Sequence, residues 1–404
     1  VIRTVELRNN SNIRIENSQF VKNQASFGGA LFWHGDWSQV SIIDCAVHNN
    51  TAGHGGGMFW SSGSPTITGC SVRGNNADAY RLEALEGSLL GFSVLYQYLG
   101  EEGFYGGGGG LFCWSSGARI ESCFISDNMA SGSGGGVYFG GDANVPVLRN
   151  CLVKGNSAVL DGGGIVSYWY ITPEIWNCTI VDNAAYDVRD ATKHGRGGGI
   201  SCSYESQTLL TDSILWGNTG TNGNQIAIGS DLEPVYIDRP AVLTVSHCDI
   251  QGGQGGVYME PGRTLNWLGG NIDTDPRFVL PYYYLSQTAA GQAVNSPCVN
   301  AGSGSVVDLD LTNFTTRSDG VNDAGVADMG LHYPTAAGQL SLTVKVVGTH
   351  GTVAPMSGLF NKYTVVVLTA KVDPGYRVKW IGTDDDTSAA LTNTVTMHSS
   401  KVVT

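Results

Sequence analysis

The sequence is poor in charged residues and has no long apolar run. Asp, Glu, Lys and Arg make up 14% of its 404 residues, well below the usual quarter. No apolar run reaches the roughly 18 residues that a membrane-spanning helix needs, so we predict no transmembrane segment. Bases are scarce: 22 Lys and Arg stand against 35 Asp and Glu, for a net charge of −13. Since phosphate binding needs clustered bases, we expect no nucleic-acid partner.

Motifs for zinc binding and for targeting are also missing. There is no CxxC pair and no His-rich cluster, which argues against a zinc site. The chain begins at Val1 without Met, shows no signal peptide, and residues 1–16 already read as an incoming strand or cap. We therefore expect a targeting segment, and further coils of the same fold, to precede Val1 in the precursor.

Glycine is abundant instead, at 57 residues, and a repeat organises the first two thirds of the chain. One copy, residues 151–164, reads CLVKGNSAVLDGGG, and seven copies follow one another about 25 to 35 residues apart, except where a segment is inserted. Each copy starts with Cys or Ser, has an apolar residue two positions later and Asn five positions later. These asparagines are Asn23, Asn50, Asn75, Asn128, Asn156, Asn183 and Asn218.

This repeat predicts an all-β fold, a right-handed parallel β-helix. The period is that of a solenoid, and apolar residues at alternate positions indicate strands with one buried face. Glycine clusters in every copy would break helices. Because Asn tolerates left-handed backbone, we expect these residues to form a ladder of side-chain amide hydrogen bonds. The solenoid should span 1–334, with an insertion at 78–105 and a C-terminal capping region at about 250–334.

The nine cysteines allow two interpretations. A disulfide framework would suit a secreted protein. Stacked residues of successive coils, however, lie about 4.8 Å apart with parallel Cβ bonds, which is too wide for a relaxed disulfide. We therefore predict a ladder of free, buried thiols. Six occupy one column of the repeat and two a second column: Cys45, Cys70, Cys123, Cys151, Cys178 and Cys248, then Cys113 and Cys202.

Two resemblances bear on function. GNIDTDPRFV (270–279), SPCVNAG (296–302) and DGVNDAGVADMGLHY (319–333) resemble the C-terminal end of bacterial secreted right-handed β-helix proteins of the pectate-lyase-like superfamily, of the choice-of-anchor type. Residues 340–404 are similar to a divergent internalin-type B-repeat, a small β-grasp-like module of surface proteins, through Gly351, Pro355, Gly358, Gly375–Tyr376 and Trp380. The resemblances imply an extracellular or cell-surface location and a second domain at 340–404, cut short at its end.

Candidate catalytic residues lie on the strands that follow the cysteines. Polysaccharide lyases on this fold need a basic residue or Ca²⁺ beside an exposed sheet, and His48, Arg73 and Lys154 should point outward there. Asp127 and Asp182 share one column and could serve as a hydrolase pair. Because these residues belong to different coils, solvated charges on a strand face are the favoured interpretation.

Aromatic residues should form a stripe on the outside of another strand column. They could stack on sugar rings, or the apolar insertion at 78–105 could fold over them. We expect that insertion to pack on its own coils through Leu89, Leu90, Phe92 and Leu95. The residues that could bind a glycan or partner are Phe32, Phe59, Phe112, Trp114, Tyr138, Tyr168 and Trp169, with Tyr96, Tyr98 and Phe104 at the rim of the insertion.

An Asp-rich segment closes the β-helix region. Its oxygen ligands suit Ca²⁺, and the alternative is that they form Asx turns. The candidate ligands are Asp308, Asp310, Asn313, Asp319, Asp323 and Asp328.

The sequence thus favours a non-catalytic structural or adhesive protein of a bacterial surface, matrix or appendage. Its expected partners are a polysaccharide or other surface-protein subunits, including copies of itself. The alternative is a polysaccharide lyase or glycoside hydrolase acting on an acidic polysaccharide.

Overall fold

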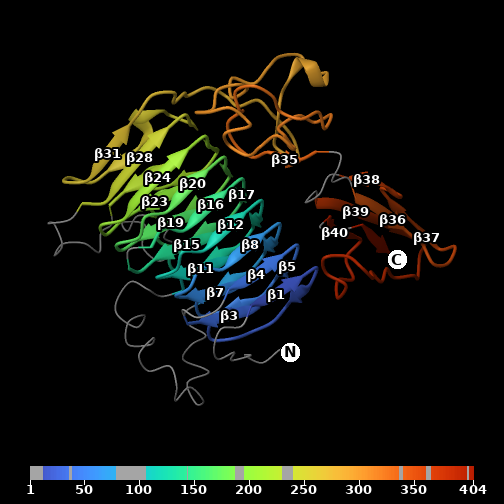
Figure 1. Cartoon of the computed structure of the whole chain (residues 1–404). Helices are drawn as coiled ribbons and strands as arrows, with labels where there is room; N and C mark the ends of the chain where they lie inside the picture. Colours follow the sequence, from blue (N-terminus) through green and yellow to red (C-terminus); the bar gives the residue numbers. More distant parts are fainter. Residues whose placement is uncertain are drawn as a thin grey trace.

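The computed structural model describes residues 12–35, 39–78, 106–142, 144–186, 195–229, 240–335, 340–360, 365–397 and 400–404. These residues form a parallel β-helix, a segment that folds back along it, and a small C-terminal β domain (Figure 1). The predicted all-β solenoid is confirmed. Within the described residues the only helical elements are two short 3-10 turns, η3 (Gln254–Gly256) and η4 (Thr288–Ala290).

Four parallel sheets run along the β-helix, and a typical coil adds one strand to each. The back sheet contains β1 (Ile13–Glu16), β4 (Val40–Ile43), β8 (Thr66–Thr68), β12 (Arg119–Glu121), β16 (Val147–Arg149), β20 (Glu174–Trp176), β24 (Gln207–Thr211), β28 (Val242–Ser246) and β31 (Thr264–Trp267). The cysteine sheet, whose strands follow the cysteine column, contains β2 (Gln19–Val21), β5 (Ala46–His48), β9 (Ser71–Arg73), β13 (Phe124–Ser126), β17 (Leu152–Lys154), β21 (Thr179–Val181), β25 (Ile214–Trp216) and β29 (Asp249–Ile250).

Two further sheets complete each coil. The turn sheet contains β6 (Thr51–Ala52), β10 (Asn76–Ala77), β14 (Met129–Ala130), β18 (Ser157–Ala158), β22 (Ala184–Ala185) and β26 (Thr219–Gly220). The aromatic sheet contains β3 (Leu31–His34), β7 (Met58–Ser61), β11 (Leu111–Trp114), β15 (Val137–Gly140), β19 (Ile165–Tyr168), β23 (Ile200–Cys202), β27 (Ile226–Ile228) and β30 (Tyr258–Met259).

The interior of the β-helix is filled by side chains at alternate strand positions. In the cysteine sheet, Val47 pairs with Val72, and Val72 with Ile125, and all three are fully buried. The expected aliphatic column of the aromatic sheet also stacks in register, from Leu31 through Met58 and Leu111 to Ile226. Identical spacing in successive coils therefore places similar residues on top of one another, so the repeat in the sequence becomes stacked columns in the core.

The predicted asparagines form a continuous ladder inside the turn after the cysteine sheet. The side-chain oxygen of Asn156 accepts bonds from both the backbone N–H (3.0 Å) and the side-chain amide (2.9 Å) of Asn128. The same pair of bonds links every neighbouring asparagine from Asn23 to Asn218. The ladder then continues through glutamines, because Asn218 donates to Gln225 (2.6 Å) and Gln225 to Gln251 (3.1 Å).

The cysteines are unpaired and buried, as the spacing argument requires. The backbone N–H of Cys70 donates to the sulfur of Cys123 over 3.4 Å, and that of Cys123 to the sulfur of Cys151 over the same distance. In the copy where Ser213 replaces cysteine, its hydroxyl accepts the corresponding bond from Cys178 at 3.1 Å. The column therefore acts as a row of small buried side chains that accept weak hydrogen bonds.

Residues 278–335, which we call the cover segment, follow the last strand of the β-helix, β31. They run back along the outside of the cysteine sheet, where Tyr283, Tyr284 and Tyr333 pack against Phe124 and Leu152. The expected capping region therefore lies in large part along a sheet face. The outward positions of these strands include apolar residues as well as Ser126 and Lys154, and the cover segment buries the apolar ones. The cover segment carries two small hairpins, β32 (Phe278–Val279) with β33 (Tyr284–Leu285), and β34 (Phe314–Thr315) with β35 (Tyr333–Pro334).

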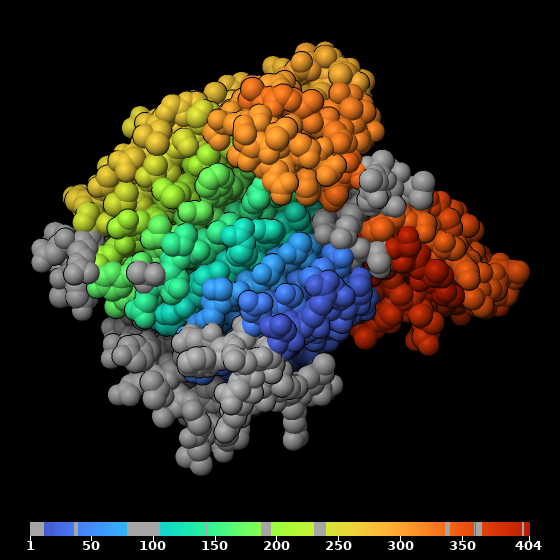
Figure 2. Space-filling view, viewed as in Figure 1, coloured from blue at the N-terminus to red at the C-terminus, as the bar shows by residue number. Residues whose placement is uncertain are grey.

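The C-terminal domain, residues 340–404, has a core of its own around Leu368, Trp380, Val395 and Met397. It contains two three-stranded sheets. Their strands are β36 (Leu340–Val344), β38 (Gly358–Phe360) and β41 (Lys401–Val403), then β37 (Gly351–Ala354), β39 (Val365–Val372) and β40 (Thr392–Thr396). Figure 2 shows this domain (red) beside the first coils (blue) and the cover segment (orange) over the later ones.

Candidate functional site

The outer face of the cysteine sheet carries the predicted catalytic residues. The register places His48, Arg73 and Lys154 in one outward column, as predicted, with Ser126 between Arg73 and Lys154. Asp127 and Asp182 each follow a strand of this sheet and adopt left-handed backbone, with φ of 55° and 56°. All five candidates therefore border the same face. Whether a substrate can reach them depends on which parts of the chain cover that face.

The cover segment occupies the later coils of this face. The hydroxyl of Tyr283 donates a 2.7 Å hydrogen bond to the Asp182 carboxylate. The Lys154 ammonium lies 4.9 Å from the centre of the same tyrosine ring, within range of a cation–π contact. Burial, reinforced by the Asp182 carboxylate, raises the pKa of Tyr283 above its ordinary value. Lys154 and Asp182 thus hold the cover segment in place.

Further along, side chains of the coils hold the cover segment through hydrogen bonds to its backbone. Asn150 and His332 exchange two of them: His332 N–H donates to the Asn150 side-chain oxygen (2.7 Å), and the Asn150 amide donates to the His332 carbonyl (2.8 Å). Asp212 accepts a 2.6 Å bond from the Ser303 backbone. Burial raises the pKa of Asp212 above its ordinary value. These contacts come from turn positions of the coils, so the repeat itself provides the anchors.

The C-terminal domain occupies the first coils of the same face. Lys22 forms a 3.0 Å ion pair with Asp385, and the Gln19 side chain donates to the Thr383 carbonyl at 3.4 Å. Arg73 reaches Thr394 at 3.4 Å while it pairs with Asp127 at 3.1 Å. Between the two parts lies a cavity of about 390 Å³ lined by His48, Asn49 and Arg73 from the coils and by residues of 367–394 from the domain.

His48 is poorly placed for proton transfer. It is 3% exposed, and its Nε2 atom lies 2.8 Å from the Ser71 hydroxyl. Burial lowers the pKa of His48 below its ordinary value, so the ring is neutral at pH 7. The neutral ring instead links two neighbouring coils through its hydrogen bond to Ser71.

The structure thus distributes the five candidates over two contacts. His48 and Arg73 lie at the contact with the C-terminal domain, Lys154 and Asp182 lie beneath the cover segment, and Asp127 pairs with Arg73 between them. Each has a structural partner. Sequence reasoning missed those partners, Tyr283 and the Asp384–Asp386 turn, because both come from segments more than 100 residues away in the chain. The run of three tyrosines at 282–284 was the available signal.

The aromatic stripe points outward as predicted, but most of it is buried. Phe59 and Phe112 stack with centroids 4.9 Å apart, and Phe112 and Tyr138 at 4.4 Å. These three side chains are at most 2% exposed, and Tyr168 is 6% exposed. The glycine turn at Gly107 lies against the rings of Phe112 and Tyr138. These four rings form a second hydrophobic core, so of the two interpretations burial holds for them and stacking on sugars does not. Phe32, Trp114 and Trp169 pack on its edge and are partly exposed.

The apolar insertion lies outside the described residues, which omit 79–105. The predicted contacts of Leu89, Leu90, Phe92 and Leu95 therefore stay predictions. The same holds for the rim residues Tyr96, Tyr98 and Phe104.

Acidic side chains of the Asp-rich segment bind different partners. Asp319 pairs with Arg317 at 2.6 Å, and Asp308 accepts a 2.6 Å bond from Ser305. Asp323 lies 3.0 Å from the His332 ring, and Asp328, which is 1% exposed, accepts a 2.6 Å bond from the Asn300 backbone. Asp310 and Asn313 lie in the turn between Leu309 and β34. Among the described residues, no three acidic, His or Cys side chains converge on a common point for a metal. The Asp319 carboxylate also accepts a 3.3 Å bond from the Val321 backbone N–H, as in an Asx turn. Calcium binding by this segment stays a prediction.

Comparison with known families agrees with this architecture. The model of the right-handed beta helix region matches residues 3–180 and 101–275, and that of the divergent InlB B-repeat domain matches residues 342–404. No curated protein and no solved structure gives a significant match.

Both domain types are typical of surface or secreted proteins. Across the described residues, no helix has the length and apolarity required to span a membrane. The β-helix matches together cover well over half of the chain. The protein therefore belongs to the right-handed β-helix family, with a divergent InlB B-repeat domain at its C-terminal end.

Proposed function

We propose that this protein is a non-catalytic structural or adhesive component of a bacterial surface, matrix or appendage. One observation carries the proposal: the outer face of the cysteine sheet is occupied by the chain's own cover segment and C-terminal domain. The candidate acids and bases on that face are used to hold these two parts. A β-helix reinforced in this way is a stiff rod on which other contacts can be built.

The proposal is tested against the enzyme alternative directly. The full chain is incubated with polygalacturonate and with alginate, with and without added Ca²⁺, and the release of unsaturated uronides and of reducing ends is measured. We expect neither product above the level of heat-denatured protein. Product formation that is lost in Lys154→Ala or Arg73→Ala would make the protein a lyase or hydrolase.

Adhesion and self-association need a positive test. Retention of the protein on matrix or cell-wall material, together with its sedimentation behaviour, measures both. Deleting 79–104 and joining the ends with two glycines should leave the β-helix folded while reducing one of the two activities. If the deletion variant folds and both activities are unchanged, the insertion is not the contact surface.

A further inference from the structure

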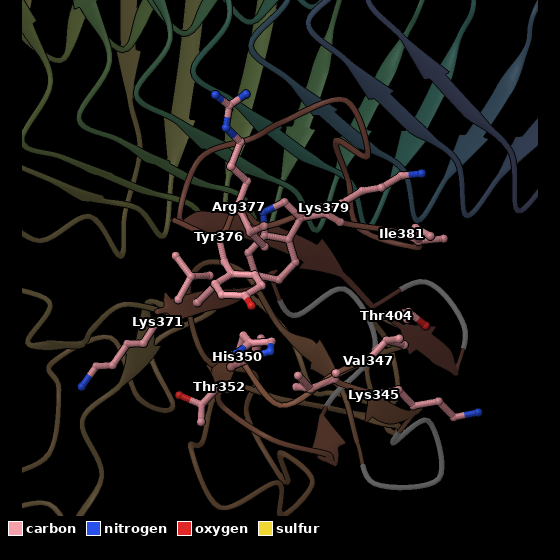
Figure 3. A pocket seen from close by; sticks show the side chains of 18 residues that line it. Lys345, Val347, His350, Thr352, Lys371, Tyr376, Arg377, Lys379, Ile381 and Thr404 are labelled. Atoms are coloured by element: carbon pink, nitrogen blue, oxygen red, sulfur yellow. The ribbon is translucent and has the colours of Figure 1, made fainter. Parts of the chain in front are cut away.

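The C-terminal domain contains an open groove, and among the described residues the hydrogen bonds from this domain to the β-helix come from outside the groove. The groove has a volume of about 460 Å³, within the range of ligand pockets, and all of its lining comes from residues 345–404. Its walls are the loop after β36, the paired strands β37 and β39, and residues 376–381 (Figure 3).

The centre of the groove is aromatic and apolar. The rings of His350 and Tyr376 stack almost parallel, with centroids 3.9 Å apart and an interplanar angle of 10°. Tyr376 is 50% exposed, and Val347 is 85% exposed. Exposed apolar side chains gathered in a concave surface are typical of binding sites. The stacked pair offers a flat, rigid platform on which a ring-shaped ligand can lie.

The rim of the groove is basic. Lys345, Lys371, Arg377 and Lys379 all line it, and Figure 3 shows their side chains extending outward from the groove in different directions. No acidic residue is among the described residues that line it. An acidic residue next to the groove is Asp373, whose carboxylate lies 3.5 Å from the ring of His350.

This concentration of bases contrasts with the rest of the chain. Residues 340–404 contain six Lys and Arg against four Asp, whereas the whole chain has 22 against 35. Three of these four acids are consecutive, Asp384–Asp386, and they belong to the turn that contacts the β-helix through the ion pair of Asp385 with Lys22. Four of the six bases thus line the groove, whereas three of the four acids lie in the turn that faces the coils.

We propose that this groove binds an acidic polysaccharide, with a uronate-containing chain as the fitting ligand class. Sugar rings present apolar C–H faces that can lie on Tyr376, and their carboxylates can accept charge-assisted hydrogen bonds from the rim bases. An open groove accepts a chain that enters and leaves on both sides. Nucleic acid fits less well, since its affinity comes from many phosphate contacts, and four bases on an acidic protein supply few.

This proposal rests on the proposed adhesive function and names the ligand that the protein would adhere to. The test uses the full chain and measures binding of polygalacturonate by titration calorimetry, with dextran as the neutral control. We expect binding to polygalacturonate that weakens as salt rises, and none to dextran.

Matched variants locate the binding. Tyr376→Ala should weaken polygalacturonate binding about tenfold, whereas Tyr376→Phe, which keeps the ring, should bind like the parent. Lys371→Gln and Arg377→Gln should each weaken it about three- to fivefold. Lys401→Gln removes the same charge in the same domain outside the groove and should leave affinity unchanged. Thermal unfolding of each variant checks that the fold is retained.

Three results would overturn this proposal. The first is no binding of polygalacturonate at low salt. The second is equal weakening by Lys401→Gln, which would mean attraction without a site. The third is binding of polyglutamate or duplex DNA as tight as that of polygalacturonate with no effect of Tyr376→Ala. If groove binding fails while the protein still adheres and releases no uronides, only the groove assignment is wrong; release of uronides overturns the proposed function instead.

Discussion

At the scale of single residues, the asparagine ladder satisfies every hydrogen bond of a buried amide. Asn128 donates to the Val72 carbonyl and to Asn156, each at 2.9 Å, and accepts two bonds of 2.9 Å from Asn75. It is 1% exposed, so water cannot replace a lost partner. The ladder therefore couples each coil to the next through groups that are costly to leave unpaired.

Asn128→Ala should lower the free energy of unfolding by about 1–3 kcal/mol for each buried group left unpaired. Denaturant unfolding followed by circular dichroism measures the change. The control is Asn266→Ala, which removes a single exposed bond of 3.1 Å to Thr244 and should change stability little. Equal midpoints for Asn128→Ala and the parent protein would contradict the ladder's contribution.

The thiols should be unreactive in the folded protein. Burial raises the pKa of Cys113 and of Cys202 to about 12, and it also raises the pKa of Cys151 well above its ordinary value. Because the thiolate is the reactive form, no labelling by a thiol reagent is expected at pH 8 until the protein is unfolded in guanidinium. Rapid labelling of native protein, or disulfides found by mass spectrometry, would refute this.

At the scale of elements, the glycine turns set how closely successive coils can stack. A Cβ at Gly135 would lie 2.4 Å from the backbone oxygens of Gly163 and Ser157. Because both clashing atoms belong to the backbone, no side-chain rotation can remove the clash. The turn therefore needs glycine for close approach rather than for flexibility.

Gly135→Ala should accordingly destabilise the β-helix by about 1–3 kcal/mol or more. At Gly269 no atom lies within 4 Å of the added Cβ, so Gly269→Ala is the matched control and should be nearly neutral. Calorimetric melting temperatures of the two variants test the difference. A Gly135→Ala variant that melts with the parent would mean that the coils can separate freely at this turn.

The cover segment buries carboxyl groups against the coils. Burial raises the pKa of Asp249 to about 6, and it also raises the pKa values of Asp212 and Asp328. A carboxyl group whose pKa is higher folded than unfolded favours the folded state below its unfolded pKa. That advantage disappears as pH rises through the folded pKa. Because of these groups, the free energy of unfolding should fall as the pH rises from about 4 to about 6.

Asp249→Asn should remove this dependence at one position. Relative to the parent, the variant should gain about 2–3 kcal/mol of stability between pH 4 and pH 7, measured by urea unfolding at both pH values. Asp308→Asn is the control, since Asp308 is exposed. A difference between variant and parent that stays constant with pH would contradict the burial argument.

At the scale of the whole molecule, the β-helix, cover segment and C-terminal domain meet on one sheet face. Lys22→Asp should loosen the C-terminal domain, because it places like charges at the 3.0 Å contact with Asp385. The double variant Lys22→Asp with Asp385→Lys should restore the contact. Small-angle scattering and limited proteolysis of residues 335–345 measure the release.

The contribution of this ion pair to the stability of the contact is expected to be small, up to about 1 kcal/mol, since Lys22 is half exposed. Identical scattering for all three proteins would show that the pair does not hold the domain.

The position of the cover segment shows why part of the site escaped prediction. The register of His48, Arg73 and Lys154 follows from strand alternation alone, and it is correct. The partners of Arg73 and Lys154 outside the coils could not be inferred, because Thr394 and Tyr283 reach the sheet through connections whose path no local pattern encodes. The aromatic stripe shows the same division: its outward direction was predictable, whereas the sequence left open whether Phe59, Phe112 and Tyr138 are exposed or buried.

The sequence by itself determined the coils. In a β-helix every strand contacts the strand one repeat away, so a periodic sequence specifies its own neighbours, and the asparagine and cysteine columns could be assigned without coordinates. Only the tertiary structure decided what covers the cysteine sheet and where the groove opens in the C-terminal domain. Those contacts join segments that share no period, and their geometry depends on how side chains of unrelated stretches fit together.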